Sequence, residues 1–137
     1  PAPGRAPRLA VARDCRLSGP RLRAQLVEGL VAGGAHVLDV GEGPTPYLYS
    51  AVHALDVDGG VMITGSHNPG DENGFKIMRG KGSFFGADIQ TLRAAIESGS
   101  GLPGAAAPVE PGSVTSVEHR DAYIQRVTEG IRLARTD

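Results

Sequence analysis

A regular alternation of short apolar runs with amphipathic segments, joined by brief loops, is the feature that most constrains the fold of this chain. Residues 8–12, 37–40 and 60–64 are apolar runs that predict buried strands, and residues 75–78 predict a further short strand. Strands that alternate with helices at this spacing commonly run parallel beneath covering helices. The predicted fold class is therefore α/β. We expect a three-layer sandwich in which a mostly parallel or mixed sheet lies between helices.

Four helices are predicted from apolar side chains that recur at three- and four-residue spacing. Ser18 and Thr45 are the expected N-caps of the first two helices, and Asp88 and His119 open the last two. These apolar stripes are expected to face the interior. Their members are Leu22, Leu26, Leu30, Leu48, Ala51, Val52, Leu55, Ile89, Leu92, Ile96, Tyr123, Val127 and Ile131.

Three other stretches carry turn-forming residues. Residues 1–7 are small and proline-rich, which predicts a flexible N-terminal segment before a domain at residues 8–133. Residues 79–86 predict a turn with an exposed aromatic pair. Residues 98–112 are rich in Gly, Ala, Pro and Ser, and this composition predicts a long surface connection.

The charge and cysteine content exclude several classes of protein. Lys and Arg total 14 against 15 Asp and Glu, so the formal net charge is −1. A nucleic-acid surface requires clustered positive charge in excess, and no run approaches the roughly 18 apolar residues of a membrane span. Cys15 is the only cysteine, which excludes an internal disulfide and a CxxC motif. We expect a soluble, cytoplasmic protein with no nucleic-acid or membrane partner.

Three loops leave the carboxyl ends of the predicted strands, at residues 13–19, 41–46 and 65–73. In open α/β sheets the binding crevice lies at these ends. The third loop is the most informative, because an apolar strand delivers a serine onto a turn that Gly65 and Pro69 make rigid. A functional site is therefore expected there.

Polar side chains gather around that serine, Ser66. His67 and Asn68 follow it directly, and neighbouring backbone N–H groups could form an anion-binding nest. The Asn73-Gly74 pair is a strong turn signal that would fold the next strand back, so that Lys76 approaches Ser66. Lys76 and Lys81 are the only lysines of the chain.

Ordinary turn chemistry accounts for the same residues equally well, since Ser, Asn and Gly are common turn formers. A serine-hydrolase site is disfavoured, because the nucleophile-elbow pattern needs glycines two positions before and after the serine. Thr64 and Asn68 occupy those positions. Composition alone leaves the two interpretations of the loop, functional and structural, open.

The string TGSHNP at residues 64–69, followed by NGFKIM at 73–78, strongly resembles the phosphoserine loop of the α-D-phosphohexomutase superfamily. The strings ARDCRLSGPRL, VLDVGEGPTPYLY and GGVMITGSHNP extend the resemblance, which covers about residues 8–133. It implies the first domain of enzymes that interconvert hexose 1- and 6-phosphates through a phosphorylated serine and a magnesium ion.

The resemblance also implies roles for single residues. Ser66 would hold and donate the phosphoryl group, and one of its phosphate oxygens would ligate Mg²⁺. His67 matches the adjacent active-site histidine, and Lys76 matches a lysine near the phosphoserine that could shuttle a proton. Asn68 and Arg16 are the expected phosphate-binding residues. A phosphoserine carries about −1.5 to −2 charges, which fits a cation and a lysine nearby.

Other parts of the superfamily pattern are absent. The aspartate-rich metal loop is missing, and Asp56 and Asp58, which precede a strand, are interpreted as a turn between helix and strand. The Y-D-I-R-G strand is missing too, and Ala12 replaces the glycine before Arg13. Arg13 or Arg16 could fill part of that place, although both could equally be solvated loop charges.

Three functions follow as hypotheses. The chain could be the phosphoserine domain of a larger mutase, which acts on a hexose phosphate together with further domains and is inactive alone. It could instead be a non-catalytic module that binds phosphate or a sugar phosphate. It could also be an interaction fragment that associates with itself through an exposed interdomain surface.

Overall fold

The computed structural model describes residues 5–99 and 110–131, which form one six-stranded sheet and four helices. The strands are β1 (Arg8–Arg13), β2 (His36–Glu42), β3 (Gly59–Ile63), β4 (Phe75–Arg79), β5 (Gly82–Ser83) and β6 (Ser113–Ser116). The helices are α1 (Gly19–Ala32), α2 (Thr45–Ala54), α3 (Ala87–Ser98) and α4 (Arg120–Glu129). None of the helices in these two ranges is long and apolar enough to cross a membrane.

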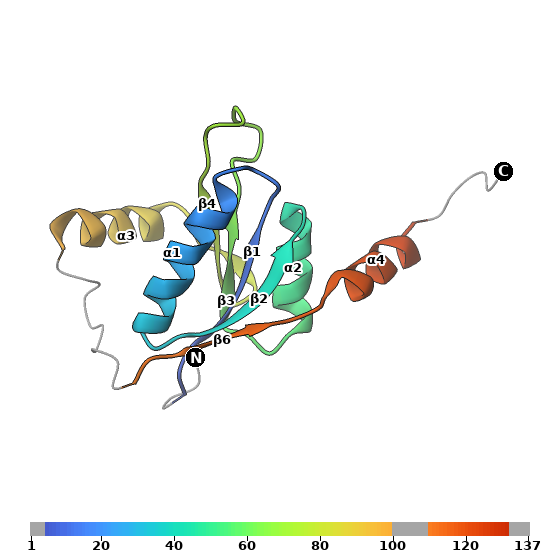
Figure 1. Cartoon of the computed structure of the whole chain (residues 1–137), viewed down its shortest axis with the longest axis horizontal. Helices are drawn as coiled ribbons and strands as arrows, with labels where there is room; N and C mark the ends of the chain where they lie inside the picture. The colour runs from blue at the N-terminus through green and yellow to red at the C-terminus, as the bar shows by residue number, and fades with distance from the viewer. Residues whose placement is uncertain (1–4, 100–109, 132–137) are drawn as a thin grey trace.

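The sheet is mixed, with the strand order β5-β4-β3-β1-β2-β6. Parallel pairs join β1 to β2, β1 to β3, and β2 to β6, whereas β4 and β5 add antiparallel pairs at one edge. Helices α1 and α3 lie on one side of the sheet, and α2 and α4 lie on the other (Figure 1). The predicted fold class, an α/β three-layer arrangement around a mostly parallel or mixed sheet, is confirmed.

The core lies on both faces of β1 and β3, and the strand alternation divides it. Ala10 and Ala12 face α2, whereas Val11 faces α1. Leu48 of α2 is fully buried, a burial that stabilises the fold by about 1.5–3 kcal/mol. Helix α2 approaches β3 so closely that a Cβ atom at Gly60 would lie 2.8 Å from a methyl group of Val52. The apolar runs of the sequence therefore build this central sandwich.

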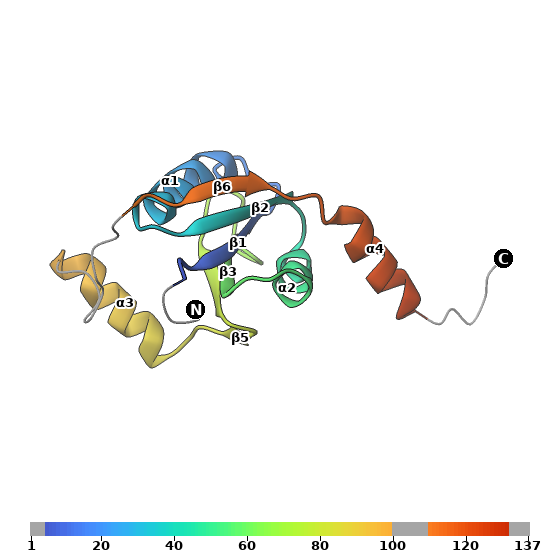
Figure 2. The same cartoon turned by 90° about the horizontal axis from the view of Figure 1, so that it is seen from below.

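Strand β6 was not predicted, and it lies directly after the expected surface connection. Its four residues are exposed, and among the described strands it pairs with β2 alone (Figure 2). The His36 ring Nδ1 lies 2.9 Å from the Ser113 hydroxyl, and the Gly112 backbone N–H donates to the Val31 carbonyl at 2.8 Å. Because it has no buried face, β6 carries no apolar alternation that could have predicted it.

Several expected details of the helices are wrong. Helix α2 begins at Thr45, with Pro44 as its N-cap residue. Ser18 is the N-cap residue of α1, which confirms that expectation, although its side chain makes no capping hydrogen bond. The predicted inward faces of the last two helices fail in part, since Ile96 is 72 % exposed and Val127 is 42 % exposed. These helices lie at the periphery of the sheet, so their apolar stripes are only partly covered.

The predicted turn at residues 79–86 contains the short strand β5. Phe85 is exposed as expected, but Phe84 is half-buried, and the Arg79 guanidinium lies 5.8 Å from its ring centre. Residues 1–4 of the predicted flexible segment, residues 100–109 of the predicted connection and residues 132–133 at the predicted domain end lie outside the described residues.

Candidate functional site: the serine loop at the carboxyl ends of the strands

The serine loop connects β3 to the antiparallel strand β4. The Thr64 backbone N–H donates to the Gly74 carbonyl at 2.9 Å and closes the base of the loop. In the β3–β4 register, Lys76 stands opposite Met62, two residues before Thr64. The Lys76 ammonium donates to the Ser66 hydroxyl, with 3.3 Å between Nζ and Oγ. The expected approach of Lys76 to Ser66 is thus confirmed, but the predicted turn at Asn73-Gly74 is wrong, because the chain reverses through the turns that begin at Gly65 and Pro69.

Ser66 has an uncommon backbone conformation. Its φ is 53°, the left-handed region that non-glycine residues occupy rarely and at a cost in free energy. Its backbone N–H donates to the Thr64 hydroxyl at 2.9 Å. Its side chain is exposed to solvent. The Ser66 hydroxyl is therefore open to solvent, while the backbone of Ser66 is held by hydrogen bonds at its N–H and at its carbonyl.

Arg16, from the loop after β1, occupies the inside of the serine loop. Its Nε–H donates to the Asp14 carboxylate at 3.2 Å, and its two terminal nitrogens donate to four loop carbonyls. These carbonyls belong to Ser66, Asn68, Pro69 and Glu72. All five N–H groups of the guanidinium are thereby used. This arrangement favours a positioning role for Arg16 over the expected phosphate-binding role.

Asp14 links this arginine to the base of the loop. Burial by itself would raise the pKa of Asp14, but hydrogen bonds from the Thr64 hydroxyl and the Arg16 backbone N–H, with the Arg16 charge, hold the pKa below its usual value. The Thr64 hydroxyl thus donates to Asp14 and accepts from the Ser66 backbone. Sequence reasoning missed Asp14, although an aspartate directly after a buried strand was a usable signal.

The two other predicted loop residues are also exposed. His67 follows Ser66 on the loop surface. The Asn68 side-chain amide donates to the Glu72 carboxylate at 2.8 Å, and its backbone N–H donates to the Gly65 carbonyl at 2.9 Å. Since the backbone N–H groups of Ser66 and Asn68 are both used within the loop, the expected anion nest loses two of its donors.

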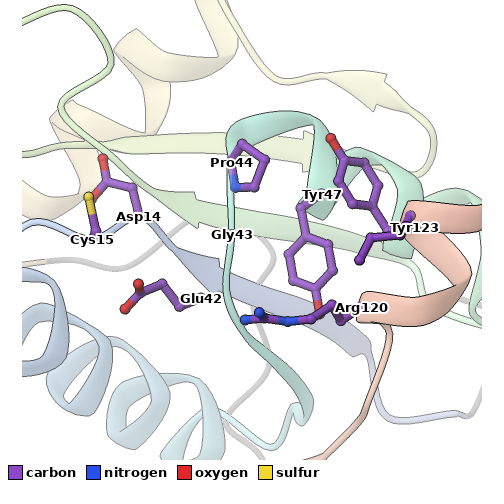
Figure 3. A pocket seen from close by; sticks show the side chains of 9 residues that line it. Asp14, Cys15, Glu42, Gly43, Pro44, Tyr47, Arg120 and Tyr123 are labelled. Atoms are coloured by element: carbon purple, nitrogen blue, oxygen red, sulfur yellow. The ribbon is translucent and has the colours of Figure 1, made fainter. Parts of the chain in front are cut away.

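Two cavities meet at the loop after β1. An open cavity of about 770 Å³ adjoins Ser66, and its other lining residues are Asp14, Cys15, Arg16, Leu17, Ser18, Gly70 and Asp71. A second cavity, of about 480 Å³, shares Asp14 and Cys15 and extends past Glu42 and Pro44 towards Tyr47, Arg120 and Tyr123 (Figure 3). The Ser66 crevice therefore continues along the carboxyl edge of the sheet to α4.

The far wall of the second cavity is built from contacts between α2 and α4. The Tyr47 hydroxyl donates to the Val40 carbonyl at 2.8 Å, and its ring packs edge-to-face on Tyr123 with 5.4 Å between ring centres. The His119 ring Nε2 lies 3.0 Å from the Ser50 hydroxyl. These contacts attach α4 to α2. The cavity thus has an aromatic wall at Tyr47 and Tyr123 and a polar wall at Asp14 and Glu42.

The described residues do not by themselves fit a complete metal site. Across residues 5–99 and 110–131, no three His, Cys, Asp or Glu side chains converge on a point that could hold a metal ion. Asp56 and Asp58 serve the turn before β3, as expected, because the Asp58 carboxylate accepts from the Arg8 backbone N–H at 2.8 Å. Ser66 therefore stands without a cluster of carboxylates around it.

The chain matches the family described as phosphoglucomutase/phosphomannomutase, alpha/beta/alpha domain I, over residues 2–101. Its relatives include a phosphomannomutase/phosphoglucomutase from Pseudomonas aeruginosa, which is 44 % identical over 94 % of this chain and 27 % of that protein. A phosphoglucomutase from Neisseria meningitidis serogroup B is 44 % identical over 93 % of this chain and 27 % of that protein.

A solved structure is similar as well. The crystal structure of a phosphoglucomutase/phosphomannomutase family protein from Burkholderia thailandensis superposes with a TM-score of 0.80 and 38 % identity. The match covers 94 % of this chain and 29 % of that chain. The chain thus spans about a quarter of the length of the relatives it matches.

Proposed function

The chain belongs to the phosphoglucomutase/phosphomannomutase family, and we propose that residues 8–133 act as the phosphoserine-bearing first domain of an enzyme that interconverts hexose 1-phosphates and hexose 6-phosphates. The observation that carries the proposal is the 3.3 Å contact between Lys76 Nζ and Ser66 Oγ, on a loop exposed at the carboxyl edge of the sheet. The cation lies where a phosphoryl group on Ser66 would bring negative charge.

The proposed reaction balances in two transfers. In the first, the bond between phosphorus and Ser66 Oγ breaks, a bond from phosphorus to a hydroxyl of the hexose monophosphate forms, and the hydroxyl proton passes to Ser66 Oγ. The product is a hexose bisphosphate. In the second transfer the bond between the other phosphorus and its sugar oxygen breaks, a bond from that phosphorus to Ser66 Oγ forms, and the Ser66 hydroxyl proton passes to the sugar oxygen. This leaves the isomeric monophosphate and the phosphorylated enzyme.

The roles of the chain's own residues follow from their positions. Lys76 stabilises charge on the transferring group and is close enough to Ser66 Oγ to carry its proton. His67, next to Ser66 and exposed, supplies a second polar side chain at the site of transfer. Asn68 binds phosphate once its side-chain amide leaves Glu72.

Membership of the family implies a metal cofactor, and we propose that it is Mg²⁺ with an oxygen of phosphorylated Ser66 among its ligands. Mg²⁺ is a hard cation that prefers phosphate and carboxylate oxygens, and when bound it neutralises charge on the phosphoryl group. Its carboxylate ligands would come from outside the described residues. The exposed free thiol of Cys15 suits a reducing compartment, so the cytoplasm is the proposed location.

The test is phosphorylation of Ser66 in the full-length protein. After incubation with a hexose 1,6-bisphosphate, intact-mass spectrometry should find one added phosphoryl group on the wild type and on Ser83→Ala, an exposed serine of β5, but none on Ser66→Ala. Ser66→Ala should also lose kcat by on the order of 10⁴-fold, because covalent transfer is abolished. An unchanged kcat in Ser66→Ala contradicts the proposal. A raised KM with kcat preserved would indicate the binding-module hypothesis.

The 137-residue chain is proposed to be inactive alone and to associate with itself. It lacks a converging metal-ligand set among its described residues, and β6 presents an open edge of four exposed residues that a second copy could pair with. Sedimentation equilibrium should detect a dimer. A monomer at every concentration contradicts the self-association, and turnover of glucose 1-phosphate by the chain contradicts the inactivity.

A further inference from the structure

We propose that Arg16 is the positioning residue that holds Ser66 in its reactive conformation, an inference that rests on the proposed role of Ser66 as phosphoryl carrier. The hydrogen bond that Arg16 donates to Ser66 goes to the backbone carbonyl, whereas the Ser66 hydroxyl accepts from Lys76. Arg16 therefore acts on the backbone, through N–H donation to the carbonyls of the loop that carries Ser66.

The guanidinium is built into the loop. Its side chain is only 12 % exposed, and its four terminal N–H groups reach carbonyls from Ser66 to Glu72. A Cβ atom at Gly65 would overlap the guanidinium, so any other residue at that position would displace the guanidinium from its present place. Because the four carbonyls and the Asp14 carboxylate already accept from the guanidinium N–H groups, none of these N–H groups is left to donate to a phosphate ligand.

The conformation that Arg16 holds is a strained one. The left-handed backbone at Ser66 persists only where its surroundings fix it. Arg16 fixes the peptide after Ser66, through an N–H donated to its carbonyl at 3.2 Å, and Thr64 fixes the peptide before it. Asp14 accepts from both Arg16 and Thr64 and so couples the two anchors.

This anchoring sets the contact on which the proposed chemistry depends. Lys76 is held by the β3–β4 pairing, whereas Ser66 is held only by its loop. A shift of the loop would therefore change the distance between Nζ and Oγ while Lys76 stays in place. A displacement of about 1 Å in a reacting group can cost about 100-fold in rate.

The first test compares Arg16→Lys with Arg13→Lys in the full-length enzyme. A lysine has one ammonium group and cannot span four carbonyls. Arg13 is the matched control, because it is the last residue of β1, three positions before Arg16, and donates to Glu42 at 2.6 Å and to the Asp14 carbonyl at 3.1 Å. Arg16→Lys should lower kcat by about 10- to 100-fold with KM for the hexose phosphate within about threefold. Arg13→Lys should leave both within about threefold.

A second variant displaces the guanidinium without removing it. Gly65→Ala places a methyl group where the Arg16 guanidinium lies and should reproduce the loss of kcat. Combining it with Arg16→Lys should lower kcat little further, since both changes remove the same interaction. For Arg16→Ala, added guanidinium ion should restore part of kcat and ammonium should not. That rescue separates a positioning role from a general loss of folding.

The outcomes separate this proposal from the proposed function. Hydrogen exchange at the Asn68 amide, which donates to Gly65, should speed up in Arg16→Lys and not in Arg13→Lys, whether or not the protein is a mutase. If the wild type takes no phosphate on Ser66, the proposed function fails and the exchange result still stands. A raised KM with unchanged kcat in Arg16→Lys would show that Arg16 binds substrate and would overturn the inference, as would unchanged kcat and exchange.

Discussion

The two ends of the sheet both join arginines to aspartates, but they use the charges differently. At the amino end, Arg5 donates to Asp58 at 2.8 Å and Arg8 donates to Asp56 at 2.6 Å, so the charged side chains bind one another across the turn before β3. At the carboxyl end, four of the five N–H groups of Arg16 bind backbone carbonyls instead.

The difference follows from what each end must hold. The turn at residues 55–58 is short, and the Asp58 carboxylate joins it to the start of β1 by accepting from the Arg8 backbone N–H and from Arg5. The serine loop is longer, with carbonyls that point inward and a left-handed residue at its start. The planar Arg16 guanidinium donates to those carbonyls. The Ser66 hydroxyl of the loop and the Lys76 ammonium of β4 stay exposed. The arginine–aspartate pairs at the amino end therefore stabilise the fold, whereas the Arg16 contacts at the carboxyl end hold the loop that carries Ser66.

The largest expected difference between the two ends is the change in kcat when Lys76, beside Ser66, or Lys81, in the turn after β4, is replaced. Lys76→Met in the full-length enzyme should lower kcat by about 10²- to 10⁴-fold, because the cation that contacts Ser66 Oγ is lost. Lys81→Met, which removes the other lysine from the turn beyond β4, should leave kcat within about twofold. Steady-state kinetics measures both, and urea unfolding should be nearly the same in both, since both side chains are exposed. Equal kcat in the two variants contradicts the assignment of Lys76.

A change at the amino end should reverse this pattern. Asp58→Asn weakens the bonds to Arg5 and to the Arg8 backbone, and the side chain is only 14 % exposed. The free energy of unfolding should fall by about 1–2 kcal/mol, while kcat stays unchanged. Asp56→Asn is the matched control, since Asp56 is 77 % exposed and its loss should cost about 0.5 kcal/mol or less. A fall in kcat in Asp58→Asn would mean that the two ends are not independent.

The smallest effect is a shared dependence on acid pH. The Arg8 backbone N–H and the Arg5 charge lower the pKa of Asp58, and the Thr64 and Arg16 contacts lower the pKa of Asp14 against the effect of burial. A carboxyl group whose folded pKa is lowered stabilises the fold above its unfolded pKa, and this contribution is lost as pH falls through the folded pKa.

Both ends should therefore lose stability below about pH 4. Urea unfolding at a series of pH values measures the slope. Asp58→Asn and Asp14→Asn should each flatten the acid slope, and only Asp14→Asn should also lower kcat near neutral pH. An acid slope that is the same in both variants as in the wild type would contradict the assignment of these carboxylates.

The sequence by itself determined the central strands, the first two helices and the serine loop. Each depends on a local pattern: an apolar run such as residues 60–64, a stripe such as Leu22, Leu26 and Leu30, or turn-forming residues such as Gly65 and Pro69. The approach of Lys76 to Ser66 was also predictable, because a strand that returns antiparallel after a short loop comes back to the start of that loop.

Only the tertiary structure decided the rest. Strand β6 gains its hydrogen bonds from β2, more than 70 residues earlier, and has no buried face to mark it in the sequence. Arg16 reaches carbonyls 50 to 56 residues away, and carbonyl groups are the same in every residue, so no side-chain pattern announces the contact. Local propensity and apolar periodicity depend on neighbouring residues and can be recognised in the sequence. The carbonyls that bind Arg16 become a binding site only when the folded chain brings them to one point.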